Sequence, residues 1–269
     1  MSSRAIPSPF TSKVVVVTGA AEGLGQEAVV AFIAAGAERI AIVDSSSISD
    51  THARASQVAR EAGRPGVEIL SVQFEVGNAA SVDAGVTAIH SRWGHADILI
   101  NTPCRASSLG RQRQPLGASD IDNWWKSWEV NVKDAFVVAN ALLPLLLKGG
   151  EKTIVNIGST SSSSLKSTSH GQDLSGLAMM RLSEGLMADR GNEGLLAYTL
   201  LPSQYGVGNT GESITPKLTS DALVHLTSRR QESFAGRHIK CEKGVHDVIS
   251  DNDWLLAKEE AVCQEVAID

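Results

Sequence analysis

The segment Lys13–Gly25, with the sequence KVVVVTGAAEGLG, decides the fold. Its first half is an unbroken run of β-branched residues, which is typical of a central parallel strand buried on both faces. Three glycines, at 19, 23 and 25, then allow a tight turn into a predicted helix that ends near Gly36. Such a turn presents unpaired backbone N–H groups and the positive end of the helix dipole to a pyrophosphate. The segment therefore predicts a nucleotide-binding cradle.

An acidic residue in the expected place strengthens this interpretation. Asp44 ends the second predicted strand, Arg39–Asp44, and a carboxylate there accepts the adenosine ribose hydroxyls and repels a 2′-phosphate. Glu22 adds negative charge on the same side, although it is equally explained as a solvated acid in the first helical turn. The sequence thus favours NAD(H) over NADP(H). The residues predicted to hold the cofactor here are Thr18, Gly19, Glu22, Gly23, Leu24, Gly25 and Asp44.

The rest of the chain alternates strand and helix. Further strands are predicted at 67–74, 97–101, 153–158 and 195–201, with helices at 79–92, about 120–147 (bent at Pro144) and 174–190. This alternation predicts an α/β, single-domain Rossmann fold: a doubly wound parallel sheet with helices on both faces. We expect an N-terminal arm at 1–12, the domain at 13–250 and a helical tail at 251–269.

Composition excludes several classes of protein. Of the 269 residues, 42% are hydrophobic and 20% are charged, and the net charge is −6 without a basic cluster, which disfavours a nucleic-acid or anionic-membrane partner. Three unpatterned cysteines predict neither a disulfide framework nor a metal site. With no secretory or membrane-spanning stretch evident, we expect a cytoplasmic protein that acts on a small molecule.

Four motifs give the sequence a resemblance to the short-chain dehydrogenase/reductase family over roughly residues 12–245. They are TGAAEGLG at 18–25, DILIN at 97–101, WWKSWEVN at 124–131 and IVNIGS at 154–159. The resemblance implies that Ser159 is the catalytic serine and that Asn131 supports a proton relay. It also implies cofactor contacts from Glu75 and Val76 at the adenine, from Asn101, and from Pro202 beside the nicotinamide.

The resemblance fails at the residues that do the family's usual chemistry. The family's tyrosine and lysine would fall at Gln172 and Gly176, and the good downstream match, which begins at Ser175, supports this register. Loss of the tyrosine removes a general acid that contributes ~10²- to 10⁴-fold. Gln172 can donate a hydrogen bond but cannot release a proton at neutral pH.

Three hypotheses follow. The first is a nicotinamide-dependent reductase of secondary-metabolite type whose substrate, such as an iminium, needs no proton donor. It would resemble fungal alkaloid-pathway members of the family that reduce and then template a cycloaddition (Diels-Alderase type). The second is a non-redox cyclase, isomerase or dehydratase in the same pocket, and the third is a nucleotide-binding pseudoenzyme.

Several side chains are candidates for catalysis or substrate binding in the pocket. Ser159 lies at the carboxyl end of a strand and could orient a substrate oxygen. His170 and Asp173 could act as general acid or base, Arg105 could anchor an acidic group, and Tyr205 begins an expected lid at 205–220. Each is alternatively a solvated loop residue.

The two longest predicted helices bear on assembly. In the family, helices such as 120–147 and 174–190 pair between subunits, so the resemblance implies a homodimer or homotetramer. Trp124 and Trp128 share one face of the first helix, and Trp125 lies on another.

Overall fold

A computed structural model of the chain describes residues 8–103, 120–158, 170–202 and 216–241, without the side chains of 170–173 and 240–241. Seven parallel strands form one sheet in the order β3-β2-β1-β4-β5-β6-β7. The strands are β1 Val14–Thr18, β2 Arg39–Asp44, β3 Glu68–Gln73, β4 Ile98–Asn101, β5 Thr153–Ile157, β6 Leu196–Pro202 and β7 His238–Cys241.

Helices connect the strands and cover both faces of the sheet. The α-helices are α1 Gly23–Ala34, α2 Ser49–Glu61, α3 Ala79–Trp93, α4 Ile121–Trp128, α5 Asp134–Leu146, α6 His170–Arg190 and α7 Pro216–Thr227. The shorter helical segments are η3 Glu129–Lys133, η5 Gly191–Glu193 and η6 Glu232–Phe234. Within the described ranges, no helix combines the length and apolarity needed to cross a membrane.

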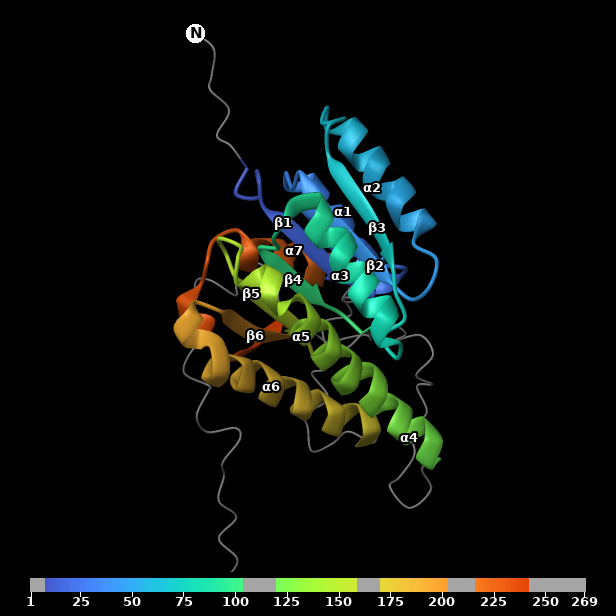
Figure 1. Cartoon of the computed structure of the whole chain (residues 1–269), viewed down its shortest axis with the longest axis vertical. Coiled ribbons are helices and arrows are strands. Elements are labelled where there is room, and N and C mark those ends of the chain that lie inside the picture. Colours follow the sequence, from blue (N-terminus) through green and yellow to red (C-terminus); the bar gives the residue numbers. More distant parts are fainter. Residues whose placement is uncertain (1–7, 104–119, 159–169, 203–215, 242–269) are drawn as a thin grey trace, which may run out of the picture.

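The central strands divide the hydrophobic core into two layers. Val15 and Val17 of β1 pack with α1, α2 and α7, whereas Val14 and Val16 pack with α3 and α5 on the other face. Figure 1 shows α3, α5 and α6 on one side of the sheet and α1 and α7 behind it. Burial on both faces explains why the first four residues of β1 are all valine, and the predicted doubly wound parallel sheet is confirmed.

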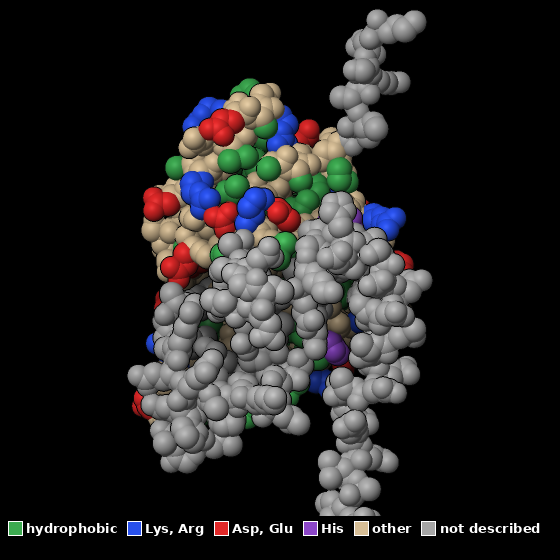
Figure 2. Space-filling view, turned by 180° about the vertical axis from the view of Figure 1, so that it is seen from behind, with side chains coloured by type: hydrophobic (Ala, Val, Ile, Leu, Met, Phe, Trp, Pro, Cys, Tyr) green, Lys and Arg blue, Asp and Glu red, His purple; other side chains and the backbone are tan. Residues whose placement is uncertain are grey.

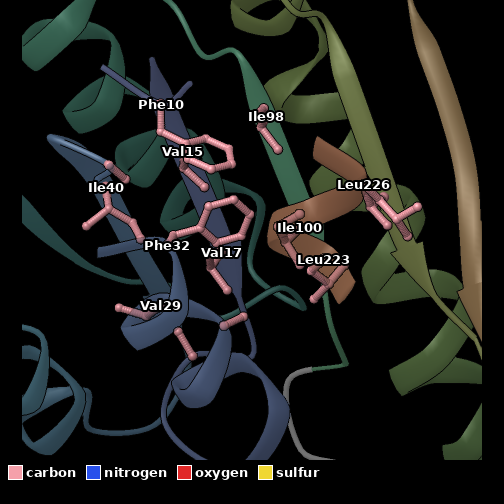
Figure 3. Packing of buried hydrophobic residues seen from close by; sticks show 14 of the residues in the cluster. Phe10, Val15, Val17, Val29, Phe32, Ile40, Ile98, Ile100, Leu223 and Leu226 are labelled. Carbon is pink, nitrogen blue, oxygen red and sulfur yellow. The ribbon is translucent and has the colours of Figure 1, made fainter. Parts of the chain in front are cut away.

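The start of the described chain belongs to the core. Phe10 lies within the segment expected to be a loose arm, yet its side chain is fully buried. Its ring meets that of Phe32 of α1 edge-on, with centroids 5.2 Å apart. Figure 3 shows both rings beside Val15 and Val17 of β1. Burial of Phe10, together with a hydrogen bond from the Ser8 hydroxyl to the Ala35 carbonyl (2.6 Å), therefore holds this segment against the domain.

Two helices and one strand were not predicted, and two predicted helices differ in detail from those observed. Helix α2, helix α7 and strand β7 are additions, and α7 occupies the end of the stretch expected to form a lid. The predicted helix 120–147 is present as the continuous succession of α4, η3 and α5, in which residues 129–133 have π-helical hydrogen bonding and α5 continues through Pro144. Helix α6 begins four residues before the predicted start, at His170 instead of Leu174. The bend at Pro144 and the arm–domain–tail division remain predictions.

Candidate active site

The carboxyl ends of β1 and β4 meet at the point where the strand order reverses, which is where open α/β sheets bind ligands. Thr18 and Thr102 tie these ends together. The Thr18 hydroxyl donates to the Thr102 carbonyl (3.0 Å), and the Thr102 hydroxyl donates to the Thr18 carbonyl. Thr18 is fully buried and its hydroxyl is hydrogen-bonded to Thr102. Its predicted contribution to cofactor binding would therefore be to hold the glycine turn in place.

Glycines at two positions make the turn after β1 sterically possible. A Cβ on Gly19 would lie 2.6 Å from the Thr102 hydroxyl oxygen and 2.7 Å from the Pro103 carbonyl oxygen, and the φ of Gly19 is +59°. A Cβ on Gly25 would lie 2.0 Å from the Gly19 carbonyl oxygen. Both values are far inside van der Waals contact, so these positions require glycine.

Gly23 faces the open side of the same turn. A Cβ there would meet no atom within 4 Å, although its φ of +58° also favours glycine. Glu22 occupies the N-cap position of α1 with no side-chain hydrogen bond to the helix, and its side chain is exposed. The first-turn N–H groups of α1 are thus left without a side-chain cap, as an anion-binding helix end requires.

Asp44 lies beside this turn and is nearly buried. Its Oδ2 accepts a hydrogen bond from the Ala21 backbone N–H (3.0 Å), and its Oδ1 accepts one from that of Ser46 (2.8 Å). Each carboxylate oxygen has a second lone pair for a ribose hydroxyl. Asp44 therefore stabilises the turn through these hydrogen bonds. Its negative charge is also the feature on which the predicted preference for NAD(H) over NADP(H) rests.

The other residues predicted to contact the cofactor lie around the glycine turn and at the ends of other strands. Val76 is buried in the core, whereas Glu75 is exposed and its backbone N–H bonds to the Ser81 hydroxyl (3.1 Å). Leu24 packs against the core from α1, and Pro202 is half-buried at the end of β6. These positions surround the carboxyl edge of the sheet.

Asn101 belongs to a chain of buried polar side chains that sequence reasoning missed. Its amide nitrogen donates to the Asn156 side-chain oxygen and to the Ala135 carbonyl, each at 3.0 Å. Asn156 then donates to the Ser183 hydroxyl (2.9 Å), which bonds to that of Thr199 (2.8 Å). The chain links β4, β5, α6 and β6 and satisfies buried polar groups that would otherwise be costly. The available signal was an asparagine inside the apolar strand TIVNI.

Asn131 lies in η3, where the helix departs from α-helical bonding. Its side-chain nitrogen donates to the Ser175 hydroxyl at 2.9 Å, which joins η3 to α6 next to position 176. Short π-helical segments are frequently found at functional sites. A cavity of about 10 Å³ adjoins this contact and is lined by Asn101, Thr102, Pro103, Val130, Asn131, Asp134, Ala135, Val138 and Met179.

Several candidates lie outside what is described. Ser159, Arg105 and Tyr205 fall in the undescribed ranges, and the side chains of His170, Gln172 and Asp173 are not described. Their backbone places 170, 172 and 173 in the first turn of α6, and Gly176 is buried one turn further on. The roles of these residues remain predictions.

Comparison with known proteins decides the family. A family model described as short chain dehydrogenase matches residues 13–172. The protein named short chain dehydrogenase mpl6 of Monascus purpureus is 31% identical over 253 residues, 91% of this chain and 85% of the relative. The chain belongs to the short-chain dehydrogenase family. Short chain dehydrogenase andI of Emericella variicolor is 28% identical, with 90% and 86% of the two chains covered.

A solved structure supports the fold of this short-chain dehydrogenase. The L-sorbose reductase of Gluconobacter frateurii, complexed with NADPH and L-sorbose, superposes with a TM-score of 0.72 at 21% identity, covering 89% of this chain and 98% of that one. Membership of the family implies a nicotinamide dinucleotide, NAD(H) or NADP(H). The open face of Gly23, the uncapped start of α1 and the carboxylate of Asp44 fit such a group.

Tyr198 is not placed to act as a proton donor in this short-chain dehydrogenase. It lies within β6 with its ring against that of Phe234, and the side chain is fully buried. Burial raises the pKa of its phenol far above the usual value. Within the described ranges its hydroxyl has no hydrogen-bond partner. The role of Tyr198 is therefore to pack in the hydrophobic core.

The Tyr198→Phe variant tests this role. We expect it to be about 1 kcal/mol more stable than the wild type, because it removes a buried hydroxyl that makes no hydrogen bond. Urea denaturation measures stability, and NADH binding should be unchanged. Tyr198→Ala is the packing control and should lose about 3–5 kcal/mol. A loss of about 2 kcal/mol or more in Tyr198→Phe would show that the hydroxyl is hydrogen-bonded.

Proposed function

We propose that this short-chain dehydrogenase binds NAD(H) and reduces a substrate that needs no tyrosine proton donor, such as an iminium ion in secondary metabolism. The observation that carries the proposal is the combination of a sterically complete glycine cradle with glutamine at 172 and glycine at 176. The turn keeps glycine at positions 19 and 25, where a Cβ atom would clash with neighbouring backbone or side-chain atoms.

The chemistry of an iminium suits a pocket without a general acid. The bound nicotinamide would supply hydride, which carries two electrons. Hydride addition to the carbon of a C=N⁺ bond leaves both electrons of the broken π bond on nitrogen, which becomes a neutral amine. No proton is transferred in that step. A ketone would instead form an alkoxide and require the missing acid.

The protein's own residues would position the reactants. Ser159, directly after the end of β5 and Gly158, would orient the substrate by hydrogen bonding. The bond from Asn131 to Ser175 would hold the first turns of α6, and with them Gln172 and Asp173, against the pocket. The rate enhancement would then come from excluding water and from fixing the distance and angle between the nicotinamide carbon that gives the hydride and the iminium carbon that accepts it.

Cofactor preference follows from the charges beside the ribose. We expect NADH to bind at least ~10-fold more tightly than NADPH, because a 2′-phosphate would meet the carboxylates of Asp44 and Glu22. Isothermal titration calorimetry with both nucleotides measures this difference. Equal affinity, or tighter binding of NADPH, would overturn the charge argument.

Substrate class is tested with a matched pair of small molecules. In the presence of NADH, we expect turnover of N-methyl-3,4-dihydroisoquinolinium and none of 1-tetralone, a ketone of similar shape, as measured by loss of NADH absorbance. Robust reduction of the ketone would show that a proton donor is present and that the register at 172 and 176 is wrong. Binding of NADH without turnover of either would favour a non-redox reaction or a pseudoenzyme.

An exposed apolar face supports a homodimer or homotetramer. Helices α4, α5 and α6 lie together on one side (Figure 1), and they carry the large hydrophobic side chains with the greatest exposure among those described. These are Ile121 (78% exposed), Trp125 (57%), Phe136 (53%), Leu174 (42%) and Leu177 (39%). An apolar face of this kind marks a protein interface. On the opposite side of the molecule, Figure 2 shows basic and acidic side chains interspersed over the described surface.

Light scattering after gel filtration tests this assembly. We expect a dimer or larger for the wild type and a shift toward monomer for Trp125→Glu, because burying a charge in an apolar interface is costly. Lys217→Glu, on the exposed surface of α7, is the control and should leave the mass unchanged. A monomeric wild type would refute the interface.

A further inference from the structure

A fully buried hydroxyl on helix α2 reaches the glycine turn that precedes α1. Thr51 lies in the first turn of α2, and its Oγ1 donates a hydrogen bond to the Ala20 carbonyl oxygen (2.7 Å). The same oxygen accepts a hydrogen bond from the side-chain nitrogen of Gln26 in α1 (2.9 Å). The Thr51 hydroxyl therefore joins α2 both to α1 and to the turn, although Thr51 is not among the residues predicted to hold the cofactor.

The usual behaviour of a helical threonine does not explain this bond. A threonine inside a helix often donates to the carbonyl four residues before it in the same helix. Thr227 does so at the end of α7, where its hydroxyl donates to the Leu223 carbonyl (2.7 Å). Thr51 instead donates to a residue 31 positions away in the sequence. Because a buried hydroxyl is costly unless it is hydrogen-bonded, this pairing fixes α2 against the turn.

Thr51 and Asp44 hold opposite sides of one peptide group. The Ala20 carbonyl and the Ala21 N–H belong to the same planar unit, and in a trans peptide they point in opposite directions. Thr51 donates to the carbonyl, and Asp44 Oδ2 accepts from the N–H (3.0 Å). Rotation of this plane would break both hydrogen bonds together. The direction of the N–H, and with it the position of the Asp44 carboxylate, therefore depends on both partners.

We propose that Thr51 positions the carboxylate of Asp44 for the adenosine ribose by holding the Ala20–Ala21 peptide. This inference deepens the proposed function by assigning part of the cofactor affinity to a residue of α2, and it rests on the NAD(H)-binding part of that function. Because Thr51 is fully buried, it acts through the turn and not by contact with the nucleotide. Thr51 is thus a positioning residue.

The other side-chain connection between α2 and α1 has less influence on the turn. Arg54 bonds to the side chain of Gln26 and pairs with Glu27 (2.8 Å), but the Arg54 side chain is 44% exposed. Exposed ion pairs contribute little, because water screens them. Loss of a buried hydrogen bond that leaves a carbonyl unpaired has the larger effect. Among these contacts, the hydroxyl of Thr51 is therefore the one whose removal should disturb the turn most.

The variant Thr51→Val, which keeps the shape of the side chain, tests the inference through two affinities. It leaves the Ala20 carbonyl without its hydrogen bond, so we expect the Kd of NADH in calorimetry to rise about three- to tenfold. NADPH shares the pyrophosphate but gains less from Asp44, because its 2′-phosphate is repelled, and its Kd should rise less than about twofold. Thr51→Ser keeps the hydroxyl and should restore the wild-type Kd of NADH.

Amide hydrogen exchange, followed by NMR, tests the same bond in the absence of nucleotide. The Ala21 amide should exchange at least about fivefold faster in Thr51→Val, since the peptide can then turn away from Asp44, and at the wild-type rate in Thr51→Ser. Thr227→Val is the matched control. It removes a buried hydroxyl from α7, which also packs against α1, and should leave both the exchange at Ala21 and the Kd of NADH unchanged.

The outcomes separate this inference from the proposed function. An unchanged exchange rate at Ala21 in Thr51→Val, or an equal loss of NADH and NADPH affinity, overturns the inference. If Thr51→Val does not fold, Gln26→Met removes the donor to the Thr51 hydroxyl, and its exchange and affinities decide in the same way. If NADH binding is selectively weakened but no iminium is reduced, the positioning role stands and the proposed reductase function fails. A wild type that binds neither nucleotide overturns both.

Discussion

The structure depends on the close contact between the turn after β1 and the end of β4. The reciprocal hydrogen bonds of Thr18 and Thr102 hold these strand ends together, and Gly19 lies so close to Thr102 and Pro103 that no side chain fits between them. Gly25 brings the start of α1 equally close to Gly19. The position of the α1 N-terminus, and hence of any pyrophosphate above it, is set by these contacts.

Hydrogen bonds between buried polar side chains also stabilise the carboxyl edge of the sheet, on the β5 side of β4. Asn101 joins β4 to β5, and Asn156 extends the connection to α6 through Ser183. Because α6 also receives the Asn131 hydrogen bond at Ser175, its first turns are fixed relative to β4 and to η3. These bonds fix the helix that carries positions 172 and 176, where the sequence has glutamine and glycine.

Much of the fold could be predicted from the sequence because its central strands are predominantly apolar and its glycine turn is distinctive. The less regular parts had weaker signals. Helix α2 is polar and follows a serine-rich segment, and β7 is a four-residue edge strand. The π-helical interruption at 129–133 has no local sequence signature, since Pro144 was the more obvious irregularity and α5 passes through it.

The site was predictable to different degrees for physical reasons. The cradle and Asp44 are local in sequence, so spacing alone revealed them. Asn156 takes its structural role from hydrogen-bond partners on β4 and α6, and sequence periodicity cannot supply those partners. For Asn101, the side chain bonds to Thr18, Ala135 and Asn156, and the cofactor contact that the resemblance implied remains a prediction.

A crystal structure of the complex with NADH tests the central claim most directly. The account predicts a pyrophosphate over Gly23 at the start of α1, the adenosine ribose on Asp44, and Gln172 in the place of a proton donor beside the nicotinamide. It also predicts that no tyrosine hydroxyl or lysine amine lies within hydrogen-bonding distance of the substrate site. A tyrosine such as Tyr205 poised at the nicotinamide, or a nucleotide bound elsewhere, would contradict it.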